Sequence, residues 1–166
     1  MSTRAFLVLS ITATFMALSM SCHPAVRGSS AATAPDSLTG IVSITGTSFE
    51  QRLVLRSGNT TTILSATAAD SASLSRLGGV EVMVVGQRND QTFRVEYFRA
   101  RSVGGSPVVD GVLRNDGGRL LLETATSRIP LGNPPTALRT LVGARVWIAG
   151  SLDSGPNSYG VIVPAR

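Results

Sequence analysis

The feature that most constrains the fold of this chain is a repeat within its own sequence. Residues 74–86 (LSRLGGVEVMVVG) and 138–150 (LRTLVGARVWIAG) align without a gap. Three shorter pairs follow in matching order, namely 38–42 with 109–113, 53–55 with 120–122 and 93–95 with 159–161. The spacing between partners varies, so insertions fall between the matched segments, where loops tolerate them. The sequence therefore predicts a duplicated structural unit.

Each copy is predicted to run in the order strand, strand, strand, short helix, strand, strand. Apolar residues alternate along 80–84 and 144–148, which indicates strands with one buried face. The residues predicted to face the core there are Val80, Val82, Val84, Ala144, Val146 and Ile148. By the same alternation, a later strand should point Phe93, Val95 and Tyr97 inward, and Arg94 and Glu96 outward.

The short helix of each copy is predicted from residues that favour helix ends. In the first copy Asp70 or Ser71 can cap the helix, and Gly78–Gly79 would end it. In the second copy Asn133 would be the cap, a Pro-Pro pair at 134–135 would occupy the first turn, and Gly143 would end the helix. Turn residues at 57–59, 88–90, 115–118 and 153–155 predict hairpins between strands.

This order of elements, with the segment L-x-x-L-x-G-x-x-V-x-V-x-G, resembles the OB-fold-like repeat domains of exported bacterial proteins of unknown function. The resemblance implies an all-β fold with one short helix per repeat, in which two small five-stranded OB-like barrels lie in tandem. Their boundaries would be 37–103 and 108–166, with a linker at 104–107. A single β-sandwich or a fused barrel is the alternative, because domains this small bury a limited fraction of their surface and could share a core.

The N-terminal residues indicate an export signal. A basic residue, Arg4, precedes an uncharged apolar run over residues 5–20. A secretory signal needs an apolar stretch of roughly 7–15 residues, whereas a spanning helix needs about 20. We therefore predict a signal peptide over residues 1–21, with an uncleaved N-terminal anchor as the alternative.

Cys22 follows the apolar run directly and is the only cysteine of the chain. Its position resembles the acylated cysteine of a bacterial lipobox, although cleavage at this point without lipid is an alternative. Residues 22–36, rich in Ala, Ser and Pro, would form a flexible tether. We therefore predict an exported protein, either periplasmic or a lipoprotein of the outer membrane or cell envelope, which meets the membrane through its N-terminal lipid.

Composition excludes several chemistries. All 15 basic residues are arginine, so lysine-dependent catalysis and a P-loop are ruled out. One histidine, His23, and one cysteine cannot supply a histidine-rich metal site or an internal disulfide. The acidic residues are scattered, and none of the common hydrolase or phosphate-binding motifs occurs. We therefore expect no enzymatic activity, no cofactor and no metal.

Binding is the predicted role, at a face that OB-like barrels commonly use. Strands 2 and 3 of such a barrel and the loops between strands 1–2 and 4–5 contact ligands. Those loops are predicted at 43–51, 87–92, 114–118 and 151–158, and the candidate ligand residues are Phe49, Arg52, Arg56, Arg119 and Arg128.

The sequence favours a binding or scaffolding module of the cell envelope that contacts an unknown ligand or protein. A structural spacer or oligomerising subunit without a ligand is the main alternative. Nucleic-acid binding is disfavoured, because it needs aromatic platforms beside a basic groove, and the arginines here alternate with acidic residues.

Overall fold

The computed structural model describes residues 34–166, so the predicted signal peptide, Cys22 and most of the predicted tether lie outside the described residues. Strands make up 63% of the structure and helices 9%, so the protein is mostly β. A membrane-spanning helix is not found among the residues that the structure describes.

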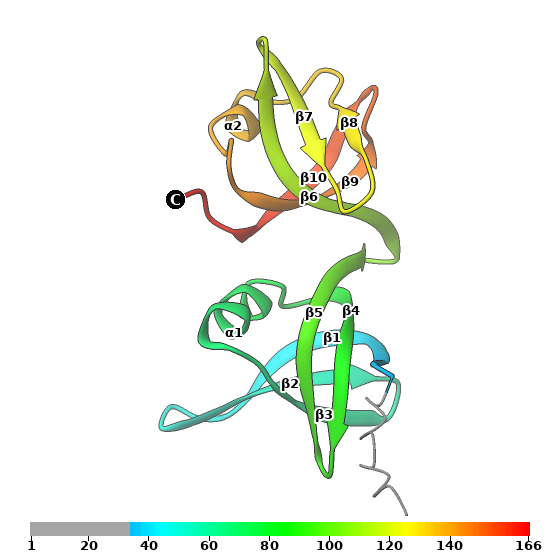
Figure 1. The fold of residues 1–166 in the computed structure, drawn as a ribbon, viewed down its shortest axis with the longest axis vertical. Coiled ribbons are helices and arrows are strands. Elements are labelled where there is room, and N and C mark those ends of the chain that lie inside the picture. Colours follow the sequence, from blue (N-terminus) through cyan, green and yellow to red (C-terminus); the bar gives the residue numbers. More distant parts are fainter. Residues whose placement is uncertain (1–33) are drawn as a thin grey trace, which may run out of the picture. The chain divides into compact units, whose positions relative to one another are not determined.

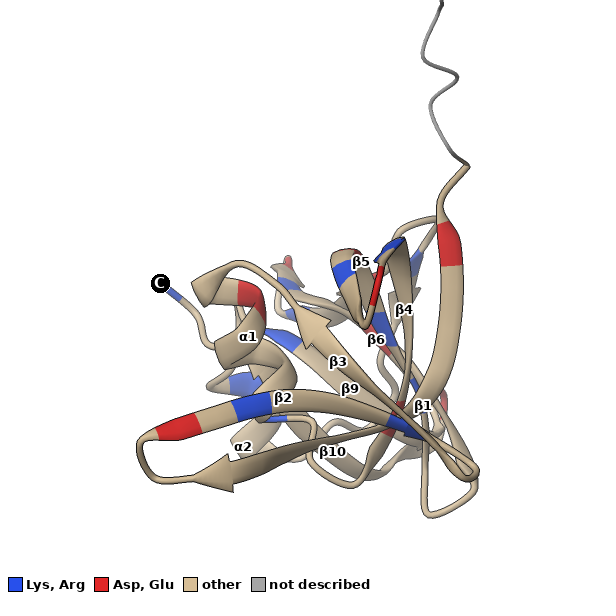
Figure 2. Cartoon of the chain, turned by 90° about the horizontal axis from the view of Figure 1, so that it is seen from below, with Lys and Arg blue, Asp and Glu red and all other residues tan. Residues whose placement is uncertain are grey.

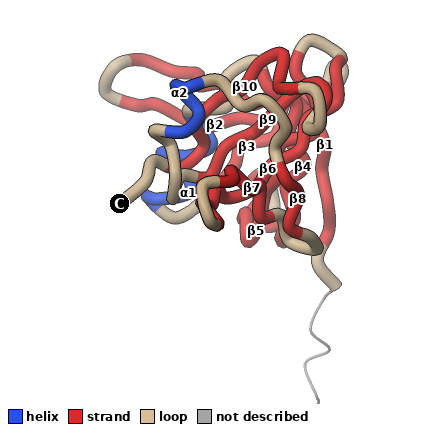
Figure 3. The backbone as a smooth tube through the Cα atoms, turned by 90° about the horizontal axis from the view of Figure 1, so that it is seen from above, coloured by secondary structure: helices blue, strands red, loops and turns tan. Residues whose placement is uncertain are grey.

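The element order in 36–103 recurs in 106–163, as the sequence predicted (Figure 1). Strands account for most of the described backbone in Figure 3, and the helices are short. In chain order the elements are β1 (Asp36–Thr47), β2 (Glu50–Ser57), β3 (Thr60–Ser65), α1 (Ala68–Ser75), β4 (Val80–Asn89), β5 (Thr92–Val103), β6 (Ser106–Asp116), β7 (Arg119–Glu123), β8 (Arg128–Pro130), α2 (Thr136–Arg139), β9 (Arg145–Ser151) and β10 (Gly155–Val163).

The first five strands form a closed barrel. Antiparallel ladders join β1 to β2, β2 to β3, β1 to β4 and β4 to β5. A parallel ladder between β3 and β5, from Ile63 opposite Thr92 to Ser65 opposite Arg94, completes the ring. Because the ring is closed, each of the five strands pairs with a neighbour on both sides over part of its length, and the two open edges of a flat sheet are absent.

The last five strands form a continuous antiparallel sheet in the order β8-β7-β6-β9-β10. No ladder between β8 and β10 is present in the described part of the chain. Just beyond β8, the Gly132 amide donates a 2.7 Å hydrogen bond to the Leu152 carbonyl in the β9–β10 turn. One backbone bond therefore lies near the seam where a ladder would close the sheet.

The two sets of strands meet through a tight turn. Gly104 and Gly105 both have positive φ, 54° and 80°, and they join β5 directly to β6. Next to the turn, Ser102 lies opposite Pro107 and Val103 opposite Ser106. Residues 104–107, predicted as a linker, thus comprise this turn and the first residues of β6.

Two clusters of buried residues form the core. The first lies in the barrel of β1–β5 and is completed by α1, whose Leu74 is fully buried. Ile162 of β10 is also fully buried in this first cluster, and Val108 and Trp147 pack against it. The second cluster lies among β6–β10 and α2. All six positions predicted to face inward along 80–84 and 144–148 are buried.

Tyr97 is a wrong prediction, because it is 45% exposed and Phe98 is buried in its place. The register of the β4–β5 ladder slips here: Val85 lies opposite Tyr97, whereas Gly86 lies opposite Val95. Glu96 is the extra residue of a β-bulge, and a bulge inverts the alternation of the residues that follow it. The inversion extends to a second register shift, at Arg101, where Glu81 lies opposite Ser102 and Val82 opposite Ala100. Residues 93 and 95 therefore face inward as predicted, and 98 and 100 do so beyond the bulge.

The helix caps and loop lengths also differ from prediction. Thr67, not Asp70 or Ser71, caps α1: its hydroxyl accepts a hydrogen bond from the Asp70 amide at 3.1 Å and donates one to the Asp70 carboxylate at 2.7 Å. Pro135 occupies the cap position of α2, and Asn133 lies before it with φ 42°. The strands run almost to the hairpin turns, so the predicted loops at 43–51, 87–92, 114–118 and 151–158 are largely strand.

We predict that Gly86→Ala destabilises the protein by about 1–3 kcal/mol, the usual cost of overpacking a closed site. A Cβ atom at Gly86 would lie 1.9 Å from the Arg94 carbonyl oxygen at the bulge. Gly78→Ala is the matched control, because a Cβ there meets no atom within 4 Å, and it should change stability by no more than about 0.5 kcal/mol. Urea unfolding of both variants measures the difference, and equal midpoints would contradict the bulge.

Candidate functional site

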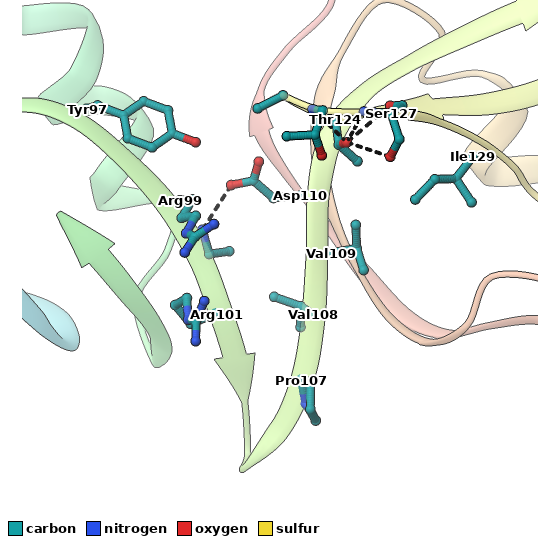
Figure 4. Close-up of a pocket in the computed structure, with 13 residues that line it drawn as sticks. Tyr97, Arg99, Arg101, Pro107, Val108, Val109, Asp110, Thr124, Ser127 and Ile129 are labelled. Carbon is teal, nitrogen blue, oxygen red and sulfur yellow. Dashed lines mark hydrogen bonds between the residues drawn. The ribbon is translucent and has the colours of Figure 1, made fainter. Parts of the chain in front are cut away.

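A cleft of about 430 Å³ opens between β5 and β6. The two strands pair only beside the Gly104–Gly105 turn. Beyond that point β5 continues its ladder with β4, and β6 pairs with β7 and β9, so β5 and β6 diverge. Figure 4 shows the residues of the cleft, with β5 on one side and β6 and the β7–β8 turn on the other. The cleft thus follows from the way the chain passes from the first barrel to the second sheet.

The β5 wall presents one aromatic and two basic side chains. Tyr97, Arg99 and Arg101 lie on the outward face of β5 because alternate residues of a strand share a face, and all three line the cleft. The bulge at Glu96 produces this arrangement. Without it, the alternation that buries Phe93 and Val95 would direct both arginines into the barrel core.

The β6 wall carries Asp110, whose carboxylate connects the two diverging strands. Its Oδ2 accepts a 2.9 Å hydrogen bond from the Ala100 amide of β5 and a 2.8 Å hydrogen bond from Arg145 of β9. The Arg145 guanidinium also donates to the Phe98 carbonyl at 2.7 Å and stacks over the Phe98 ring at 4.7 Å. We refer to these groups as the Asp110–Arg145 latch. The latch neutralises the carboxylate and holds the base of the cleft together.

The third wall is the turn between β7 and β8. Thr124 fixes its shape, because the Thr124 hydroxyl accepts hydrogen bonds from the amides of Thr126 and Ser127 at 3.3 and 3.0 Å. The same hydroxyl lies 3.1 Å from the Ser127 hydroxyl. This turn places several hydroxyl groups at the rim of the cleft, opposite the arginines of β5.

The charge of the cleft is positive. Neither Arg99 nor Arg101 forms an ion pair with any residue that the structure describes. One Arg99 nitrogen lies 3.8 Å from the sulfur of Met83, a weak acceptor. Since the carboxylate of Asp110 is neutralised by Arg145, the two arginines of β5 are available to an anion.

The residues predicted from sequence lie apart from this cleft, and the structure does not bring them together. Phe49 occupies the β1–β2 turn and is fully exposed. Arg52 of β2 is ion-paired with Glu50, and Figure 2 shows an acidic segment of β2 beside a basic one. Arg56 is exposed near the end of β2, and Arg119 begins β7.

Arg128 is already engaged within the protein. Glu123 accepts hydrogen bonds from Arg114 at 2.8 Å and from Arg128 at 2.9 Å. The guanidinium groups of Arg114 and then Arg128 hold the pKa of Glu123 below its ordinary value. A ligand at Arg128 would have to compete with this carboxylate.

A second cavity, of about 400 Å³, adjoins the predicted face but is of a different character. It lies between the β1–β2–β3 sheet and α1, and Ile44, Leu53 and Ile63 form its apolar lining. Arg52 is the one candidate ligand residue that lines it. Its one arginine is already paired with Glu50, which makes it a poorer anion site than the cleft between β5 and β6.

The cleft residues Tyr97, Arg99 and Arg101 are not among the candidate ligand residues predicted from the sequence. The signal that could have found them is the Tyr97-Phe98 pair, because two adjacent aromatic residues break the alternation of a strand and indicate a bulge. Among residues 34–166, no group of three His, Cys, Asp or Glu side chains is arranged to hold a metal ion. Comparisons of the chain with protein-family models, with curated proteins and with solved structures gave no match.

We predict that Asp110→Ala destabilises the protein by about 3 kcal/mol, because it leaves the partly buried Arg145 charge and the Ala100 amide without their acceptor. The Asp110 side chain is only 9% exposed. Arg128→Ala is the control, since its side chain is 72% exposed and its ion pair should contribute at most about 1 kcal/mol. Unfolding followed by the fluorescence of Trp147, which lies opposite Asp110 in the β6–β9 ladder, reports both variants. Equal losses would contradict the latch.

Proposed function

We propose that residues 37–166 consist of two OB-like barrels in tandem that arose by duplication. The strand pairings support this: β6–β7, β7–β8, β6–β9 and β9–β10 repeat the pairings β1–β2, β2–β3, β1–β4 and β4–β5. The β3–β5 ladder has no counterpart among the described strands, and the hydrogen bond from Gly132 to Leu152 lies at the corresponding place.

Two pairs of glycines provide further support for duplication. A Cβ atom at Gly40 would lie 2.3 Å from the Arg56 carbonyl oxygen, and one at Gly111 would lie 2.5 Å from that of Glu123. Each glycine therefore permits the same close approach of the first strand to the second strand of its unit. Gly79 and Gly143, which match in the sequence alignment, both have positive φ, 81° and 90°, after their helices.

The protein is proposed to be exported and attached to the cell envelope through lipid on Cys22. The sequence supports this by the apolar run over 5–20 followed directly by the only cysteine. The residues 22–36 then give the folded part reach from the membrane surface. The compartment is the periplasm or the envelope surface.

We predict that the full chain, expressed in a bacterium that acylates lipoproteins, incorporates a palmitate analogue only when Cys22 is present. The Cys22→Ala variant should lose the label and leave the membrane fraction, because the thiol carries the lipid. Ser21→Ala, which keeps a small residue before the cysteine, is the control and should label normally. Equal labelling of wild type and Cys22→Ala would exclude lipidation.

The folded part is proposed to bind an anionic envelope ligand without transforming it. The row of Tyr97, Arg99 and Arg101 facing an open cleft is the observation that carries this proposal. Alternate residues on a strand are about 7 Å apart, so two guanidinium groups can each take one anionic group of the same ligand. Guanidinium groups bind carboxylates and phosphates through paired hydrogen bonds, which makes arginine suited to this role.

We predict that a polyanion such as dextran sulfate raises the melting temperature of the full mature chain, and that the rise follows the logarithm of one plus the ratio of its concentration to its Kd. Arg99→Gln/Arg101→Gln should raise the Kd obtained from this response at least tenfold. Arg56→Gln/Arg119→Gln removes the same charge from the face predicted by sequence and should retain most of the response.

The same measurement separates the alternatives. A spacer or oligomerising subunit would show no shift with any polyanion. If instead the Arg56/Arg119 variant lost the response and the Arg99/Arg101 variant kept it, the ligand would bind at the strand 2–3 face and the cleft would be excluded as the binding site.

A further inference from the structure

We propose that the cleft between β5 and β6 binds an acidic oligosaccharide, with sugar carboxylates on Arg99 and Arg101 and a sugar ring against Tyr97. This inference rests on the proposed function and names its ligand class. It follows from three properties of the cleft: the length of its basic row, the acceptor on its β6 wall and the hydroxyl groups of its third wall.

The β5 row suits a chain molecule. Tyr97, Arg99 and Arg101 occupy three alternate positions of one strand, so the row extends over about 13 Å. Single small anions would engage one guanidinium and leave the other unused. A polymer with an anionic group on successive or alternate units can engage both arginines, and the exposed ring of Tyr97 extends the same line.

Asp110 adds an acceptor that an anion alone would not use. Both hydrogen bonds to its carboxylate go to Oδ2, and Oδ1 accepts none from the residues that the structure describes. Asp110 projects into the cleft together with Tyr97 (Figure 4). A carboxylate oxygen accepts hydrogen bonds and donates none when ionised. A hydroxyl group of the ligand can donate to it.

The β7–β8 turn supplies matching hydroxyl groups. Thr124 and Ser127 hold the turn in shape through bonds to one another. The Thr126 hydroxyl, by contrast, makes no hydrogen bond with any described residue, although its amide does. A ligand rich in hydroxyl groups can both donate to Asp110 and exchange hydrogen bonds with Thr126, and a sugar chain has this property.

A single-stranded nucleic acid fits the cleft less well. Strand binding without sequence preference uses several aromatic side chains on which successive bases stack. Among the described residues that line the cleft, Tyr97 is the one aromatic. An acidic sugar chain therefore satisfies more of the groups present.

The test titrates the full mature chain, by calorimetry, with three probes. The first is an oligogalacturonate, which carries one carboxylate on every ring. The second is the same oligomer with its carboxyl groups reduced to alcohols, which keeps the rings and hydroxyls and removes the charge. The third is an oligothymidylate with a matching number of negative charges.

We expect the oligogalacturonate to bind and the other two probes to bind at least tenfold more weakly. Arg99→Gln/Arg101→Gln should lose tenfold or more in affinity for the oligogalacturonate. Tyr97→Leu removes the aromatic face but keeps an apolar side chain, and Thr126→Val removes the hydroxyl at nearly unchanged size; each variant should lose about three- to tenfold in affinity. Arg56→Gln/Arg119→Gln should bind as the wild type does.

Three outcomes would overturn the inference. Equal or tighter binding of the oligothymidylate would assign the cleft to nucleic acid and leave the proposed anion-binding function intact. Equal binding of the reduced oligomer would show that the cleft does not recognise the carboxylates of the sugar chain. Failure of oligogalacturonate, oligothymidylate and dextran sulfate alike would remove the proposed function together with this inference, and a melting profile of the same sample confirms that the chain is folded.

Discussion

The β-bulge at Glu96 is the constraint on which the arrangement of the candidate site depends. It shifts the register of β5 by one residue against β4, so the strand buries Phe93 and Val95 before the bulge and Phe98 and Ala100 after it. A regular strand of this length would have carried two arginines into an apolar core, at a cost of several kcal/mol for each desolvated charge. The bulge instead places the basic and aromatic side chains on one outer face. The bulge at Glu96 thus both keeps the arginines out of the apolar core and forms the candidate binding surface.

The two halves of the folded part are bound by more than their connecting turn. Ile162, near the C-terminal end of β10, completes the core of the first barrel, and Trp147 of β9 packs against that core. The Asp110–Arg145 latch adds polar contacts from β6 and β9 to the backbone of β5. Burial supplies most of the cohesion here and is non-directional, whereas the latch has defined geometry and fixes how β5 and β6 diverge. Hydrophobic burial therefore holds the two halves together, and the Asp110–Arg145 ion pair sets the relative position of β5 and β6 at the cleft.

Much of the fold could be predicted from the sequence because its signals are local. The order of elements follows from turn residues and from period-two alternation, and the six inward positions of 80–84 and 144–148 needed nothing beyond that alternation. The Thr67 cap was also within reach, since Thr67-Ala-Ala-Asp70 places an acidic residue three positions after a threonine. The prediction that Asn133 caps the second helix was wrong. Asparagine is common both at helix caps and in turns, and here Asn133 has a left-handed backbone in the turn before Pro134 and Pro135.

The candidate site could not be predicted in the same way, because it depends on long-range register. The face on which Arg99 lies is decided by the partner strand at Gly86, and the cleft exists only because β5 and β6 take different neighbours after their shared turn. Asp110 and Arg145 lie 35 positions apart in the chain, and no local pattern connects them. The residues predicted from sequence followed a general expectation for OB-like barrels. The structure instead places Arg99 and Arg101, neither of which forms an ion pair with a described residue, beside a cleft at the junction between the halves.

The seam between β8 and β10 has a consequence for how the molecule opens. Protein backbones exchange their amide hydrogens with solvent through local opening, and regions with few ladder bonds open at the lowest free energy. The barrel of β1–β5 has a complete ring of ladders, whereas β8 and β10 share no ladder in the described part of the chain, and the bond from Gly132, just after β8, to Leu152, in the β9–β10 turn, lies beside the gap between them. Fluctuations will therefore start in β8, whose three residues have one neighbouring strand, and spread along β7 before they reach the first barrel. The β7–β8 turn at the cleft belongs to the segment that opens most easily. This wall of the cleft can therefore adjust to a bound ligand, while the β5 wall is held by the ladders of the barrel.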